Sequence, residues 1–161
     1  LTSDGHTHWM TGTSAPCTSV FKPVWIDSGL PEFSTFPNEE YDGATRWWRH
    51  ENLHRELLRD YATRIKVIEA ERTALEETFI THTQDRTDLS VEARSGLTLT
   101  CFNEVEQVEA KWLEEIYRIP VQKRRPVLDR IAWQNFDRQA QRPHSAQAQL
   151  GAYPHKKINA R

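Results

Sequence analysis

Two short runs rich in threonine, tryptophan, valine, phenylalanine and isoleucine stand near the start of the chain, at 6–11 and 19–27. Between them lies Gly-Thr-Ser-Ala-Pro-Cys-Thr, a composition typical of turns, so the pattern predicts an antiparallel hairpin. Apolar side chains alternate onto both sides of the second run, which indicates a strand that is buried on both faces. Pro23 has no N–H to donate to a ladder, so we expect it at an edge or a bulge.

Helical periodicity follows a connecting loop at 28–40, which its prolines and phenylalanines indicate is ordered. From about 42 to 80 the pattern predicts one long helix, whose narrow seam consists of His54, Leu58, Tyr61, Ile65, Ile68, Arg72, Leu75 and Phe79. Ser90 is a suitable N-cap for a second helix, whose apolar positions are Cys101, Val105, Val108, Trp112, Ile116 and Ile119. We expect these two helices to pack antiparallel. Pro120 ends the second helix, and Pro126 opens a third through Leu128, Ile131 and Phe136.

The predicted fold is therefore α+β but mainly α, with an N-terminal hairpin followed by long antiparallel helices. The hairpin and its ordered loop occupy 1–40, a helical subdomain occupies 41–141, and a polar tail that we expect to be loosely attached occupies 142–161. With 161 residues the chain is one domain of ordinary size. Its 37% apolar and 27% charged residues indicate solvent-exposed helices around a thin core.

The charge balance excludes a broadly basic surface. There are 21 Lys and Arg against 23 Asp and Glu, a net charge of −2, so neither nucleic acid nor membrane lipid is a predicted partner. No apolar run approaches the ~18 residues that cross a bilayer, and the first thirty residues lack the pattern of a signal peptide. We expect a soluble protein, with the cytoplasm favoured. Cys17 and Cys101 form no C-x-x-C pair and are predicted to be unpaired thiols.

Residues 50–54 read His-Glu-Asn-Leu-His and match H-E-x-x-H. In that motif His50 and His54 would bind zinc and Glu51 would act as the general base. Catalytic zinc also needs a third protein ligand and an open position. His54 falls in the predicted packing seam, which favours a structural role for the histidines.

A third zinc ligand is hard to find near this motif. Glu69 and Glu71 lie roughly 20 Å or more along the predicted helix from His54, too far to share a metal with it. Glu104 and Glu106 of the second helix remain as alternatives. No metal or cofactor residue is therefore assigned.

Other residues with possible chemistry carry weaker signals. His6 and His8 share a strand face and could bind a metal. Cys17 lies in the predicted turn, but no base beside it in the sequence would activate a nucleophile. The pair at 47–48, Trp47 and Trp48, stands between arginines and could stack on bases or hold an anion, although we expect it to anchor the helix end. No G-x-S-x-G, phosphate-binding glycine loop or dinucleotide fingerprint is present.

Two segments carry a family resemblance. "TGTSAPCTSVFKP" at 11–23, followed by Trp-Trp-Arg-His-Glu-x-Leu-His-Arg at 47–55, resembles the C-terminal part of the secernin and dipeptidase A family of cysteine peptidases. The resemblance implies an αββα N-terminal nucleophile hydrolase, in which the hairpin is the last strand pair of a larger sheet and the helices cover it. The family nucleophile is an N-terminal cysteine, whereas this chain begins with Leu1. No catalytic residue therefore carries over.

The resemblance implies that this chain is the C-terminal portion of a secernin-like amidohydrolase or dipeptidase and is inactive alone. Its partner would be an N-terminal portion or companion chain that supplies the cysteine, and the helices could also mediate a homo-oligomer. Two alternatives remain open. One is a zinc metallopeptidase using the motif at 50–54, and the other is a non-enzymatic module whose heptad-like seam pairs with a partner helix.

Overall fold

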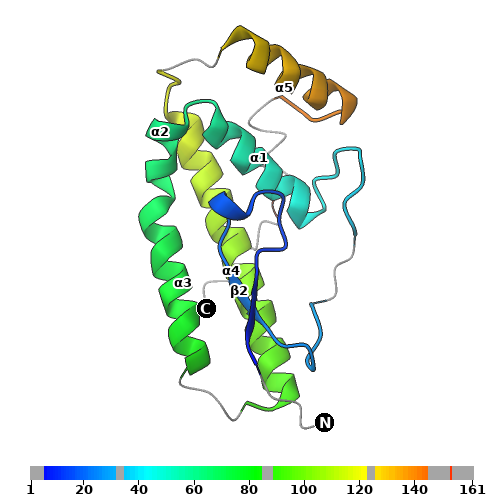
Figure 1. Cartoon of the computed structure of the whole chain (residues 1–161), viewed down its shortest axis with the longest axis vertical. Coiled ribbons are helices and arrows are strands. Elements are labelled where there is room, and N and C mark those ends of the chain that lie inside the picture. The colour runs from blue at the N-terminus through cyan, green and yellow to red at the C-terminus, as the bar shows by residue number, and fades with distance from the viewer. Residues whose placement is uncertain (1–5, 32–34, 85–88, 123–125, 145–152, 154–161) are drawn as a thin grey trace, which may run out of the picture.

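The computed structural model describes residues 6–31, 35–84, 89–122, 126–144 and Tyr153. In chain order its elements are β1 (His8–Met10), η1 (Pro16–Thr18), β2 (Lys22–Val24), α1 (Arg46–Leu58), α2 (Tyr61–Arg64), η2 (Ile65–Val67), α3 (Glu69–Gln84), α4 (Val91–Arg118) and α5 (Val127–Gln139). Figure 1 shows α3 and α4 side by side in opposite directions, with the hairpin against α4 and α5 at one end of the molecule. The mainly helical α+β class and the antiparallel helices predicted from the sequence are confirmed.

The hairpin has the predicted antiparallel pairing, although each strand is only three residues long. Trp9 lies opposite Pro23, and His8 and Met10 lie opposite Val24 and Lys22. Because proline has no N–H, the Trp9–Pro23 pair is a non-hydrogen-bonded one, and the backbone groups of both residues point away from the partner strand. The outward carbonyl of Pro23 accepts a hydrogen bond from Thr98 Oγ1 of α4 at 2.9 Å. The edge position predicted for Pro23 is confirmed.

Helices of the same chain bury the second strand. β2 contacts both α3 and α4, and all three of its residues are buried. The expected burial on both faces does not extend along the whole run 19–27, because the side chain of Ile26 is 82% exposed. The chain's own helices therefore account for the burial of β2 without a further sheet. In the described part of the chain the outer sides of both strands lack a strand neighbour, but α4 covers that of β2 through the bond from Thr98 to Pro23.

The single long helix predicted from 42 to 80 is wrong, because the chain breaks at Asp60. Asp60 leaves the helical conformation with φ −153° and ψ 72°. Its Oδ2 atom accepts a hydrogen bond from the N–H of Gln122 at 3.0 Å. The guanidinium of Arg64 then donates to the backbone carbonyls of Glu56 at 2.7 Å and Ile119 at 2.8 Å. These contacts satisfy backbone groups at the break and redirect the chain into α3.

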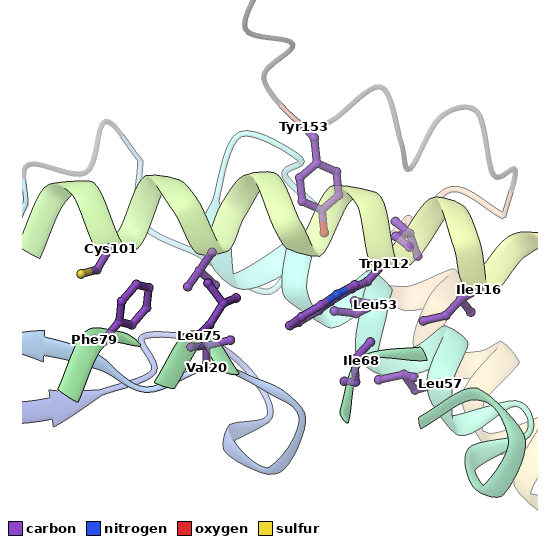
Figure 2. Close-up of a cluster of buried hydrophobic side chains, with 12 residues drawn as sticks. Val20, Leu53, Leu57, Ile68, Leu75, Phe79, Cys101, Trp112, Ile116 and Tyr153 are labelled. Atoms are coloured by element: carbon purple, nitrogen blue, oxygen red, sulfur yellow. The ribbon is translucent and has the colours of Figure 1, made fainter. Parts of the chain in front are cut away.

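The core gathers along α4. It consists of Val20, Leu53, Leu57, Ile68, Leu75, Phe79, Cys101, Val105, Trp112, Leu113, Ile116 and Tyr153, most of which Figure 2 labels. Ser90 caps α4 as predicted, since its Oγ accepts from the N–H of Ala93 at 3.2 Å. Trp112 is fully buried, and its indole N–H donates to Glu71 at 2.8 Å. Burial of large apolar side chains on one stripe of this helix supplies most of the favourable free energy.

The polar tail at 142–161 falls largely outside the described residues. Within it Tyr153 is buried in the core, and its hydroxyl donates to the carbonyl of Arg49 at 3.1 Å. This residue does not fit the expectation of a loose tail. The predicted third helix is confirmed as α5, but none of its residues is buried. No helix among the described residues is both long and apolar enough to cross a membrane.

Candidate functional site

His50, the first histidine of the motif at 50–54, is completely buried between α1, α4 and the hairpin turn. Its Nδ1 atom lies 2.7 Å from Glu109 Oε1 of α4. Its Nε2 atom lies 3.1 Å from Thr18 Oγ1 and 3.2 Å from the carbonyl of Ala15. Both ring nitrogens therefore have protein partners, and the side chain connects three parts of the fold.

The row Thr18, His50 and Glu109 has the order of hydroxyl, imidazole and carboxylate that activates a nucleophile in hydrolases. Thr18 is fully buried, however, and its hydroxyl donates to the carbonyl of Ala15 at 3.2 Å. A nucleophile must reach its substrate, and Thr18 is inaccessible to solvent. We interpret the row as a structural connection.

Glu109 is ionised within this connection. Burial by itself would raise the pKa of its carboxyl group, but His50, Lys22 and Arg49 together lower that pKa below its usual range. The buried carboxylate is thus stabilised by neighbours on α1 and β2. Removing His50, whose Nδ1 lies within hydrogen-bond distance, would leave this carboxylate buried without that partner.

Glu51, the proposed general base of the motif, points to a different set of partners. Its carboxylate accepts from Arg55 Nε at 2.6 Å and lies 3.3 Å from His54 Nδ1. Burial opposes ionisation, but these hydrogen bonds lower the pKa of Glu51 to about 2, which makes it a weak base. No group of three or more His, Cys, Asp or Glu in the described ranges is arranged to hold a metal. The geometry therefore does not support the zinc peptidase alternative.

The acidic candidates for a third ligand are engaged elsewhere or lie apart. Glu106 pairs with Arg46 and Arg49. Glu71 pairs with Lys111 and accepts from Trp112. Glu69 and Glu104 are solvent-exposed, as are His6 and His8. The structure does not bring these groups together with His54.

The two cysteines are unpaired thiols, as predicted. Cys17 is exposed on η1, whereas Cys101 is buried in the core. Burial raises the pKa of Cys101 to about 12, so this thiol stays protonated and unreactive at neutral pH.

The tryptophan pair anchors the start of α1. The rings of Trp47 and Trp48 meet edge to face with centroids 4.8 Å apart, and Trp48 is buried. The side-chain oxygen of Thr45 accepts from the N–H of Trp48 at 3.3 Å and caps the helix. The expected anchoring role is confirmed.

Lys22 is a buried cation that the sequence pattern does not reveal. It is only 2% exposed, and its Nζ donates to the carbonyl of Val20 at 2.9 Å. Nζ also lies 4.9 Å from the ring centre of Phe102. Burial lowers the pKa of Lys22 to about 8. The adjoining cavity measures only about 10 Å³, too small for a substrate.

A large open concavity lies between α1, α2 and α5. It measures about 730 Å³, within the usual range for small-molecule sites. We call it the arginine cleft, after the residues Arg55, Arg59, Arg64, Arg130 and Arg142 that line it. Tyr117 and Trp133 add aromatic surface. Sequence reasoning missed this site because its arginines come from separate elements of a chain with no excess of positive charge.

No family model matches the sequence, and no curated protein or solved structure matches it either. Function is therefore inferred from the residues and their geometry.

Proposed function

We propose that this chain is the C-terminal portion of a secernin-like cysteine amidohydrolase. It contributes the hairpin and a helical cover, and an N-terminal portion or companion chain contributes the nucleophilic cysteine. Hydrolysis of an amide would proceed by attack of that cysteine, a thioester intermediate and attack by water. The proposal rests on the two segments at 11–23 and 47–55 and on the open flank of the hairpin.

The outer flank of β1 is suited to pairing with another strand. The N–H and carbonyl of Trp9 point away from β2, because Trp9 lies opposite a proline in a non-hydrogen-bonded pair. The sheet of the described residues has only two strands, so these groups face outward without a strand partner there. An open strand edge of this kind is a template for a further strand.

Apolar side chains surround this flank. A shallow depression of about 490 Å³ is lined by Met10, Trp25, Ile26 and Leu30, among others. Met10, Ile26 and Leu30 are exposed to solvent. Exposed apolar surface beside an unpaired edge is typical of a protein–protein contact.

The flank is also held rigidly. The hairpin turn is tied to α1 and α4 through His50, and β2 is tied to α4 through Thr98. A preformed edge loses little conformational entropy when a partner strand binds. These contacts favour a structural role for His50 in the segment at 47–55.

The geometry weakens the alternative of a helical interaction module. Ile68, Leu75 and Phe79 of the predicted seam are buried in the chain's own core. The helix also breaks at Asp60, so the seam does not form one continuous surface. A partner helix would find no uninterrupted heptad stripe there.

The reading frame upstream of Leu1 provides the first test. We expect a preceding segment that begins with cysteine after processing, and a full-length product that hydrolyses dipeptides. Loss of this activity on Cys→Ala replacement at the processed N-terminus would support the proposal. A start codon at Leu1, or amidase activity from this chain alone, would overturn it.

A matched pair of variants tests the edge itself. Trp9→Pro and Trp9→Thr both lose the indole, but only Trp9→Pro also loses the outward N–H, and neither changes an N–H bonded to β2. When the two portions are expressed separately and mixed, we expect Trp9→Pro to associate roughly three- to tenfold more weakly than Trp9→Thr. Equal association of the two variants, with circular dichroism showing both folded, would show that this edge is not paired in the enzyme.

A further inference from the structure

The arginine cleft is built from four separate parts of the chain. α1 and its C-cap contribute Arg55 and Arg59, α2 contributes Arg64, α5 contributes Arg130, and Arg142 follows α5. These arginines line one cavity in a chain whose net charge is −2. The positive charge is therefore local to this cleft.

Two carboxylates that line the cleft and one beside it neutralise only part of this charge. Glu56 is shared by Arg59 at 2.8 Å and Arg64 at 3.1 Å. Asp137 is shared by Arg55 and by Arg142, the latter at 3.4 Å. Arg55 also pairs with Glu51 at 2.6 Å.

Arg130 has no ion pair within the described residues, and it is exposed at the cleft. Four guanidinium groups thus share three carboxylates in these ion pairs, and with Arg130 the five positive charges exceed the three negative charges by two. The surplus corresponds to the charge of a dianion.

Two of the arginines are buried, which strengthens their field. Arg64 and Arg142 are almost fully inaccessible, and Arg142 Nε donates to Asn52 at 2.7 Å. The Nη2 atom of Arg142 and the Nε atom of Arg64 are buried without an acceptor among the described residues. Charge in a low-dielectric setting attracts an anion more strongly than charge on the open surface. Guanidinium groups also match the geometry of phosphate oxygens.

The rest of the cleft lining is mixed: Glu56, Asp137, Gln134 and His144 are polar, and an apolar group lies beside them. Trp133, Ile119, Pro120 and Val121 form this apolar group, and the guanidinium of Arg55 stands 4.9 Å from the ring centre of Trp133. A ligand that fills this space would carry an anionic group toward the arginines and an apolar group toward Trp133. Free inorganic phosphate would use only part of it.

We propose that the arginine cleft binds a small phosphate monoester with an apolar substituent. The dianionic phosphate lies among Arg59, Arg130 and the buried arginines, and the substituent contacts Trp133. This site is separate from the hairpin flank, so it does not depend on the proposed hydrolase assembly.

Isothermal titration calorimetry with phenyl phosphate tests the ligand class, and inorganic phosphate and benzoate serve as comparison probes. We expect saturable binding of one phenyl phosphate per chain, which weakens as the salt concentration is raised. Inorganic phosphate should bind more weakly than phenyl phosphate because it lacks the apolar group. Benzoate should also bind more weakly than phenyl phosphate because it carries a single charge. Absence of saturable binding, or benzoate binding as tightly as phenyl phosphate, would overturn the proposal.

Variants at the cleft mouth test the location. Arg59 and Arg130 are both exposed, so Arg59→Gln and Arg130→Gln should leave the fold intact. Each should weaken phenyl phosphate binding about tenfold or more, because a charge-assisted hydrogen bond is lost. Lys111→Gln removes an exposed positive charge outside the cleft and should leave the affinity unchanged. An equal loss in all three variants would indicate a non-specific charge effect and contradict the site.

Discussion

Replacing Lys22 by methionine should stabilise the protein at neutral pH. Burial lowers the pKa of Lys22 from 10.5 to about 8, so the folded protein holds this ammonium at a cost. The difference between these two pKa values corresponds to about 3 kcal/mol at a pH where both states are protonated. Methionine has a similar length and no charge, but it loses the hydrogen bond to Val20, which contributes about 1 kcal/mol. We therefore expect Lys22→Met to raise the free energy of unfolding at pH 7 by about 2 kcal/mol.

The sign of this difference should reverse at alkaline pH. Between pH 8 and 10.5 the unfolded chain binds more protons at Lys22 than the folded protein does, so rising pH stabilises the wild type. Above that range the lysine is neutral in both states and its burial carries no charge penalty. Lys22→Met should then be less stable than the wild type by about 1 kcal/mol, the value of the lost hydrogen bond.

Urea unfolding followed by tryptophan fluorescence between pH 7 and 10.5 measures this difference. The raised pKa of Cys101, about 12, lowers the stability of both proteins above pH 9, so it cancels on subtraction except for the part due to the Lys22 charge, the smallest of its causes. Lys66→Met, at an exposed lysine, is the control and should leave the free energy of unfolding nearly unchanged at every pH. A constant difference between Lys22→Met and the wild type across the range would refute the reasoning.

Two further predictions concern the interior. His50→Leu should lower the free energy of unfolding by about 3–5 kcal/mol because it leaves the Glu109 carboxylate buried without its partner. Adding Glu109→Leu should recover part of that loss. If urea unfolding shows that the losses of the two single variants simply add, the connection between the two side chains is contradicted. In native protein at pH 8, a thiol reagent should label exposed Cys17 rapidly and buried Cys101 only after unfolding, as peptide mass spectrometry can measure. Rapid native labelling of Cys101 would contradict its burial.

The part of the fold that depends on one helix and one buried stripe could be predicted from the sequence. α4 begins after the predicted cap Ser90, and Cys101, Val105, Trp112 and Ile116 are buried as expected. Its apolar positions recur with helical spacing, and its polar positions have no competing use. The hairpin was predictable for a similar reason, since strand-forming residues flank a turn.

The break at Asp60 could not be predicted in the same way. Apolar residues on either side of it stay in helical register, so periodicity continues through a bend. What stabilises the bend is the contact of Asp60 with Gln122 and of Arg64 with Ile119. Both partners lie more than fifty residues away in the sequence. Local propensity carries no information about such contacts.

The candidate sites also divide into features that a local sequence pattern indicates and features that depend on distant contacts. The motif at 50–54 was visible in the sequence, but the roles of its residues depend on Glu109 and Thr18 from other elements. The burial of Lys22 and the arginine cleft left no local signal, because lysine and arginine usually extend into solvent. Only the packing of α1, α2 and α5 gathers those arginines.

The contact between β2 and α4 also has a consequence for synthesis on the ribosome. Pro23 is bonded by Thr98, and His50 by Glu109, so residues made early are covered by a helix made much later. A nascent chain that ends before residue 91 lacks α4, and the apolar surfaces of Val20, Leu53 and Phe79 that pack along it remain uncovered. Translation arrested at that point would yield a species prone to aggregation, and a chaperone that binds apolar segments would find its target there.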